Sequence, residues 1–269
     1  IVMSAAVIPV IVPLPLPIPI SSGTRDFHNE LLRIRDGKGV LVWSSVGGSP
    51  VSPGAGYLVY PDWTNCLVEN MLKLRIKIIF AELNEGSDAN WAKLWDQLAP
   101  WKQKYGYKYG VDYVILPYQA GGEAAMAAFA ANTYVTRVDY YGNDLNTLPL
   151  MKNIHTMADC SVGLVGGEVT WMVAWVRQWA EKYGLRLINA SSWMAVAPWY
   201  GTRFFGYIET YGESGQAEYE TLTGFPGDEL IKLQQSYSFA VVFIPAVVVL
   251  VIYRRLKQAK PSPVGVAKT

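Results

Sequence analysis

The central part of the chain, from residue 25 to residue 232, alternates short apolar runs with longer segments whose apolar positions recur every three or four residues. Short apolar runs that end in small or polar residues are typical of buried strands, and the longer spacing is typical of helices. Strands are predicted at residues 39–45, 75–83, 111–118, 133–140, 161–165 and 185–189. Helices are predicted at residues 64–74, 88–105, 123–131, 148–157 and 168–183. This order predicts a Rossmann-like α/β domain, with a mostly parallel sheet and helices on both faces.

Three glycine pairs follow predicted strands and precede predicted helices. They are Gly47-Gly48, Gly121-Gly122 and Gly166-Gly167, and the last two pairs are followed by Glu123 and Glu168. Paired glycines allow a sharp turn off a strand, and a glutamate in the first helical turn complements the helix dipole. Since open α/β sheets bind ligands at the carboxyl ends of their strands, these turns are candidates for lining one ligand crevice. Plain turn formation and helix capping explain the same residues, and no copy matches a nucleotide-binding motif.

A long apolar run lies near the C-terminus. Residues 233–253 read LQQSYSFAVVFIPAVVVLVIY and contain no charged residue. As a helix this run would be about 31 Å long, which matches the hydrocarbon thickness of a bilayer. The tail at residues 254–269 is basic and contains no acid. The run therefore predicts a transmembrane helix with a cytoplasmic tail, and residues 25–232 outside the cytoplasm.

The N-terminal segment, residues 1–24, is apolar and rich in proline. Residues 8–20 read IPVIVPLPLPIPI, and proline at alternate positions excludes an α-helix there because each ring removes a backbone donor. We expect this segment to be extended and to lie on the membrane or against a partner. The remnant of a cleaved signal peptide is the alternative, although no basic residue precedes the apolar stretch.

Side chains with catalytic or metal-binding chemistry are sparse. His28 is predicted in the linker before the first strand, and His155 and Asp159 are predicted on one helix face. That pair is more typical of a surface contact than of a metal site, and no nucleophile-elbow motif supports a hydrolase. We therefore predict no catalytic residue, no metal and no cofactor. Cys66 and Cys160 are the two cysteines, and either a disulfide or two buried thiols fits the sequence.

Tryptophan recurs along the helix predicted at residues 168–183. Trp171, Trp175 and Trp179 are four residues apart, with apolar neighbours around most of the helix. Such a helix lies either in the protein core or against a membrane or another subunit, so these residues are candidates for an interface. Asn189-Ala190-Ser191 is a sequon, which makes Asn189 a candidate glycosylation site.

Three segments carry a resemblance to a known family. They are residues 139–154 (DYYGNDLNTLPLMKNI), residues 168–188 with the core VRQWAEKYGLRLI, and residues 214–220 (SGQAEYE) shortly before the terminal apolar run. In these segments and their order, residues 105–253 resemble an uncharacterised family of prokaryotic membrane proteins with one C-terminal transmembrane helix. The resemblance implies a membrane protein and no known activity, cofactor or site residue.

Composition bears on the choice among functions. The chain is 51% hydrophobic and 17% charged, with a net charge of +1, which gives no basis for nucleic-acid binding. We expect a cell-membrane protein whose partners are the lipid bilayer and other membrane subunits or a second copy. The leading hypothesis is a non-enzymatic structural or interaction component of a membrane assembly. The alternatives are an anchored domain that binds a small molecule or glycan through the glycine turns, and a membrane-bound hydrolase.

Overall fold

The computed structural model describes residues 18–45, 61–81, 83, 87–167, 169–191, 193–209, 214–224 and 245–257. The chain divides into two units, Ile18–Glu229 and a second one made of Ile1–Pro17 with Leu230–Thr269. In the second unit the described part is a helix over residues 245–257. No helix in the described part of the chain is long and apolar enough to cross a bilayer. Residues 233–244 of the predicted span lie outside the described residues.

Unit Ile18–Glu229 is built on a six-stranded sheet in which every neighbouring pair of strands is parallel. Its strands are β1 (Val40–Ser45), β2 (Lys77–Phe80), β3 (Tyr113–Ile115), β4 (Val162–Gly166), β5 (Arg186–Ser191) and β6 (Phe204–Glu209). The order across the sheet is β3-β2-β1-β4-β5-β6. The predicted α/β architecture with a parallel sheet is confirmed. The strand order shows in addition that successive strands are added on one side of β1 up to β3 and on the other side from β4 onward.

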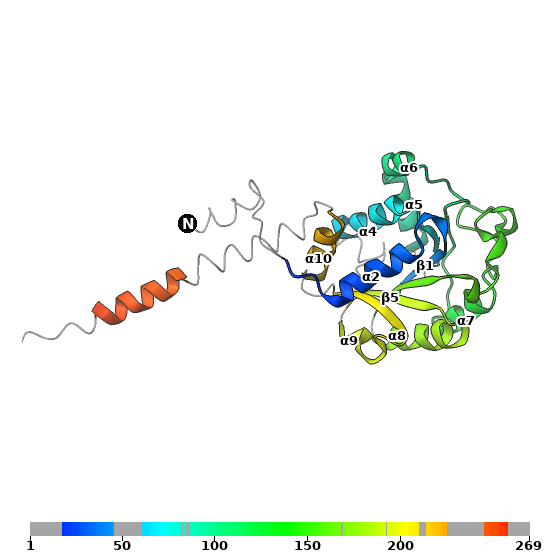
Figure 1. Ribbon diagram of the computed structural model, residues 1–269. Coiled ribbons are helices and arrows are strands. Elements are labelled where there is room, and N and C mark those ends of the chain that lie inside the picture. Colours follow the sequence, from blue (N-terminus) through cyan, green and yellow to red (C-terminus); the bar gives the residue numbers. More distant parts are fainter. Residues whose placement is uncertain are drawn as a thin grey trace, which may run out of the picture. The chain divides into compact units, whose positions relative to one another are not determined.

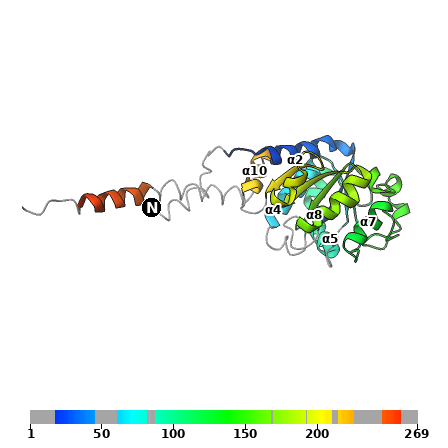
Figure 2. The ribbon, with the colours of Figure 1, turned by 90° about the horizontal axis from the view of Figure 1, so that it is seen from below.

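Helices cover both faces of this sheet (Figures 1 and 2). They are α2 (Ser22–Arg33), α4 (Pro61–Lys73), α5 (Ser87–Gln97), α6 (Ala99–Tyr105), α7 (Glu123–Ala131), α8 (Val169–Trp175), α9 (Trp193–Val196) and α10 (Ser214–Thr223). Alternate strand residues enter two separate cores, as Val42 and Trp43 do in β1. The core with Val42 packs against α7 and α8, and the core with Trp43 packs against α2, α4 and α5.

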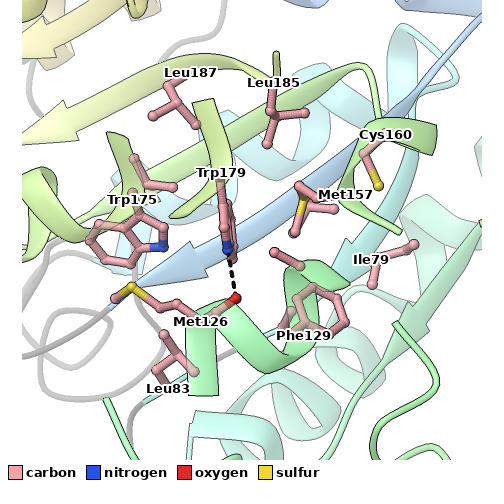
Figure 3. Packing of buried hydrophobic residues seen from close by; sticks show 14 of the residues in the cluster. Ile79, Leu83, Met126, Phe129, Met157, Cys160, Trp175, Trp179, Leu185 and Leu187 are labelled. Atoms are coloured by element: carbon pink, nitrogen blue, oxygen red, sulfur yellow. Dashed lines mark hydrogen bonds between the residues drawn. The ribbon is translucent and has the colours of Figure 1, made fainter. Parts of the chain in front are cut away.

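The predicted helix at residues 168–183 is present, but its second half is wound differently. After α8 the chain continues as a π-helix, Val176–Glu181. Trp175 and Trp179 are fully buried in the core shown in Figure 3, where Nε1 of Trp179 donates a hydrogen bond to the Met126 carbonyl at 3.1 Å. Two of the three tryptophans proposed for an interface are therefore core residues, because their helix packs directly on α7.

Two predicted elements are wrong. Residues 133–140 form successive turns instead of a strand, because Asn132 accepts a hydrogen bond from the Tyr134 amide and Arg137 has a φ of 60°. Residues 148–157 form no α-helix. Short 3₁₀ turns occur in this segment and just before it, at Leu145–Thr147, Met151–Asn153 and Met157–Asp159. Pro149 has no backbone N–H to continue a helix.

Besides the short helix α9, three helices or strands were not predicted from the sequence. They are α2, which carries His28, strand β6, and α10. Helix α2 packs on β6 at Gly206, where an added Cβ would lie 2.2 Å from the Phe27 backbone nitrogen. Glu218 of α10 accepts hydrogen bonds from the Ser21 amide (3.0 Å) and the Thr24 hydroxyl (2.8 Å). The first and last helices in the described part of this unit are thereby joined. The predicted helix at residues 88–105 is divided into α5 and α6, with Pro100 in the first turn of α6.

Candidate functional site

The reversal between β1 and β4 marks one edge of the sheet as the candidate site. From β1 the sheet extends to β2 and β3 on one side, and from β4 it extends to β5 and β6 on the other. In open α/β sheets a crevice forms outside the carboxyl ends of the strands at such a reversal, and ligands bind there. The residues that end β1, β4 and β5 are therefore the ones to consider first.

Polar side chains gather at these carboxyl ends. Ser44 pairs with Val165 across β1 and β4, and Val165 pairs with Asn189 across β4 and β5, so the three residues lie in one row. Ser191, two residues after Asn189, is buried on the same face of β5. At the other end of the central strand, Val40, Leu41 and Val42 are all apolar and buried. In β1 the buried polar side chain therefore lies at the carboxyl end of the strand.

The hydrogen bonds of this row are incomplete. Asn189 Nδ2 donates to the Val165 carbonyl at 2.8 Å, and the Ser191 hydroxyl donates to Asn189 Oδ1 at 2.6 Å. The Ser44 hydroxyl, although fully buried, has no hydrogen-bond partner in the structure as far as it is described. An unsatisfied buried hydroxyl costs about 1–3 kcal/mol, so its presence needs an explanation. A ligand atom that accepts or donates at this position supplies one.

The glycine turns predicted to line a crevice have separate roles. Gly166 is the last residue of β4, and Gly167 follows it, so both lie at the edge where β1 and β4 are neighbours. Gly121 and Gly122 follow β3 at the same edge, but a Cβ on Gly122 would lie 2.9 Å from the ring of Trp171. Gly122 therefore serves the close packing of α7 on α8. Gly47, Gly48 and Glu168 lie outside the described residues.

Glu123 links the two helices that follow these turns. Its carboxylate accepts hydrogen bonds from Arg177 Nη1 at 3.0 Å and from Gln178 Nε2 at 2.7 Å. It is thus a cross-link from α7 to the π-helix after α8, in addition to its place in the first turn of α7. The partly buried Trp171, which packs on Gly122, is likewise a contact within the domain.

The glycosylation prediction at Asn189 is contradicted. Asn189 is completely buried in β5, and its amide is held by the Val165 carbonyl. An oligosaccharide on this side chain is incompatible with the folded sheet, because β5 has a strand on each side and a packed core against this face. The sequon instead supplies two of the polar residues at the candidate site.

Neither histidine lies with the polar row. His28 is on α2 with its ring 5.9 Å from that of Tyr219, and burial, aided by the charge of Lys73, lowers its pKa. His155 precedes a 3₁₀ turn, and its backbone amide donates to Asp159 at 2.9 Å, so the two do not share a helix face. Among the described residues no group of histidine, cysteine and acidic side chains could hold a metal ion.

The cysteines do not pair. Cys66 and Cys160 are free, buried thiols in the cores on opposite faces of the sheet. Burial, together with the nearby Asp159 carboxylate, raises the pKa of Cys160 to about 12. A thiol with such a pKa stays protonated at neutral pH. Because the two thiols are free and lie on opposite faces of the sheet, the disulfide alternative is excluded for this structure.

Strand order, layers and site together define the class of this domain as Rossmann-like α/β. No protein-family model, curated protein or solved structure matches the chain. The resemblance to an uncharacterised membrane-protein family stays a prediction. Sequence reasoning placed Gly166 and Gly167 at the end of a strand, as the structure does, but did not name Ser44 or Ser191 as candidate ligand residues. The signal for Ser44 was present, since the apolar run of β1 ends in two consecutive serines.

Proposed function

We propose that the α/β domain is a membrane-tethered binding domain that holds a small, uncharged polar ligand at the carboxyl ends of β1, β4 and β5. The observation that carries this proposal is the buried, unpaired hydroxyl of Ser44, which lies between β1 and β4, where the strand order changes sides. The neighbouring Asn189 and Ser191 are uncharged, which favours hydroxyl or amide groups on the ligand over a phosphate. The bound compound would complete a polar row that the domain alone leaves incomplete.

Binding is preferred over the structural role that the sequence favoured. That role rested on the absence of a catalytic motif and on an abundance of aromatic, weakly charged surface, but Trp175 and Trp179 are buried within the domain. Ligand binding is also preferred over hydrolysis, because neither histidine contacts the polar row of Ser44, Asn189 and Ser191. His28 lies against Tyr219, and His155 stacks on Tyr134 with a ring separation of 5.5 Å.

Replacing Ser44 with alanine tests the proposed site. Because the hydroxyl is unpaired in the ligand-free protein, we expect S44A to fold with unchanged or slightly increased stability, by up to about 1 kcal/mol. The full chain in a nonionic detergent would be screened by thermal unfolding against monosaccharides, nucleosides and amino-acid amides. Compounds that raise the unfolding temperature of the wild type should lose that effect with S44A.

The control for this experiment is S161A. Ser161 immediately precedes β4, at the opposite edge of the sheet, so its loss should leave the ligand effect intact. Two results would contradict the proposal. One is a ligand effect that persists in S44A, and the other is a large loss of stability in S44A without any ligand.

The proposed tether is the segment of residues 233–253. Its support is the uncharged apolar run and the basic tail, together with the exposed side chains of the helix over residues 245–257. Every residue from 247 to 252 in this helix is apolar and at least 42% exposed. A continuous exposed apolar surface of this kind is stable only against lipid or protein.

The topology of the tether has a direct test. The positive-inside rule places the basic tail in the cytoplasm and the α/β domain outside. Protease added to intact cells should therefore degrade an epitope placed in the domain and leave an epitope on the tail intact. Detergent-permeabilised cells, in which both epitopes should disappear, are the control. Loss of the tail epitope alone in intact cells would reverse the assignment.

A further inference from the structure

A hollow lies away from the carboxyl-edge site, where α4, α6 and α10 end. Its volume is about 510 Å³, within the range of small-molecule sites. Its lining comes from the last turns of the three helices. The residues are Glu69, Asn70, Lys73, Lys104, Tyr105, Thr223 and Gly224. This hollow is unrelated to the polar row at Ser44, since none of its lining residues belongs to a strand.

Among the described residues that line the hollow, the one acidic side chain, Glu69, is already paired with a cation. Glu69 Oε1 accepts a hydrogen bond from the Tyr105 hydroxyl at 3.3 Å and lies 3.7 Å from Lys104 Nζ. Lys104 in turn lies over the Tyr105 ring, 4.9 Å from its centroid. The charges of Glu69 and Lys104 therefore compensate each other, and the positive charge of Lys73 has no partner among the described lining residues.

One carbonyl at the end of α4 and one at the end of α6 are capped by backbone amides of the chain itself. The Ile76 amide donates to the Met71 carbonyl at the end of α4 (3.1 Å), and the Tyr107 amide donates to the Lys102 carbonyl at the end of α6 (2.9 Å). Such capping pairs the carbonyls that would otherwise attract a cation. The local preference for charge is therefore set by the side chains.

Two of the lining side chains, Lys73 and Asn70, have N–H groups without an acceptor among the described residues. Lys73 forms no hydrogen bond and no ion pair in the described part of the chain, so all its ammonium N–H groups are available. Asn70 Nδ2 donates one N–H to the Tyr219 hydroxyl at 2.5 Å, and its other N–H is available to a ligand. The free N–H of Asn70 and the unpaired ammonium of Lys73 suit a group that only accepts hydrogen bonds and carries negative charge.

We propose that this hollow binds a phosphate group, with Lys73 as its main partner. The phosphate belongs either to a lipid headgroup or to a soluble compound. Gly224, on the rim of the hollow, precedes the proposed tether at Leu233 by nine residues, a length that reaches at most about 30 Å. The lipid source rests on the proposed tether, whereas phosphate binding itself does not.

The test is calorimetric titration of the full chain in a nonionic detergent. The probes are inorganic phosphate, dihexanoyl phosphatidylglycerol and, as an uncharged comparison, dihexanoylglycerol. We expect K73Q to weaken binding of the phosphate probe by about tenfold, the effect of losing one charge-assisted contact, and K73R to retain it. The matched control is K93Q, since Lys93 is an exposed lysine of α5 that does not line the hollow.

The outcomes are distinct. Binding of inorganic phosphate that depends on Lys73 supports a soluble source. Lys73-dependent binding of the phosphatidylglycerol alone supports a lipid source. Absence of binding by both phosphate probes, equal losses in K73Q and K93Q, or equal binding of dihexanoylglycerol would overturn the site. None of these results bears on Ser44, so failure here is separable from failure of the proposed ligand site.

Discussion

Substituting Gly206 with alanine is expected to destabilise the domain by about 3 kcal/mol or more, at or above the usual upper limit for overpacking. The added Cβ would lie 2.2 Å from the Phe27 nitrogen and 2.3 Å from the Phe27 Cα. Both are backbone atoms of α2, so no side-chain rotation relieves the clash. Helix α2 would have to move off β6, and Phe27 and Leu31 would lose part of their burial.

G163A is the matched control for this prediction. Gly163 lies in β4, and its added Cβ would lie 2.8 Å from Leu185 Cδ2 and Leu187 Cδ2, which are the ends of flexible side chains. We expect G163A to cost about 1–2 kcal/mol, since these leucines can shift. Urea unfolding of both variants, followed by tryptophan fluorescence, gives the comparison. A G206A protein as stable as G163A would show that the contact of α2 with β6 adjusts easily.

The second large effect is expected at Glu30, the acidic partner of a nearly buried ion pair. Its Oε1 accepts from Arg186 Nη2 at 2.6 Å, and its Oε2 accepts from Arg186 Nε at 2.8 Å and Arg33 Nε at 3.1 Å. The Glu30 side chain is 9% exposed and that of Arg186 is 37% exposed. We expect E30Q to cost about 2–3 kcal/mol, below the value for a fully buried pair because Arg186 can be rehydrated.

The stability conferred by Glu30 should depend on pH. Burial alone would raise the pKa of Glu30, but the hydrogen bonds and charges of Arg186 and Arg33 outweigh it and hold the pKa below the ordinary value. A carboxyl with a lowered pKa in the folded state stabilises fully above its unfolded pKa of about 4.5. This stabilisation is lost as the pH falls through the folded pKa. The difference in unfolding free energy between wild type and E30Q should therefore shrink below about pH 4.5.

E181Q provides the control for the pH experiment. Glu181 Oε1 lies 4.0 Å from Arg203 Nε, and the side chains of Glu181 and Arg203 are 50% and 43% exposed. An ion pair this exposed contributes at most about 0.5 kcal/mol, so E181Q should resemble the wild type at every pH. Equal effects of E30Q and E181Q would contradict the importance assigned to burial of Glu30.

Part of the candidate site was predictable from local sequence. Gly166 and Gly167 were identified because a glycine pair after an apolar run indicates a turn at a strand end. Asn189 was identified for the wrong reason, since a sequon carries no information about burial. Ser44 was missed because one serine at the end of a strand is common. Its importance depends on the reversal between β1 and β4, which is a property of strand order.

The sequence by itself determined the alternation of strands and helices over most of the domain, because apolar periodicity reflects which face of each element is buried. It did not determine which surface covers that face. The tryptophans of α8 and the following π-helix are equally apolar against a subunit or a core, and only the packing on α7 decided for the core. Strand β6 and helix α2 depend on each other through Gly206, a contact between residues far apart in the chain. Such long-range contacts leave no local pattern, so tertiary structure alone revealed them.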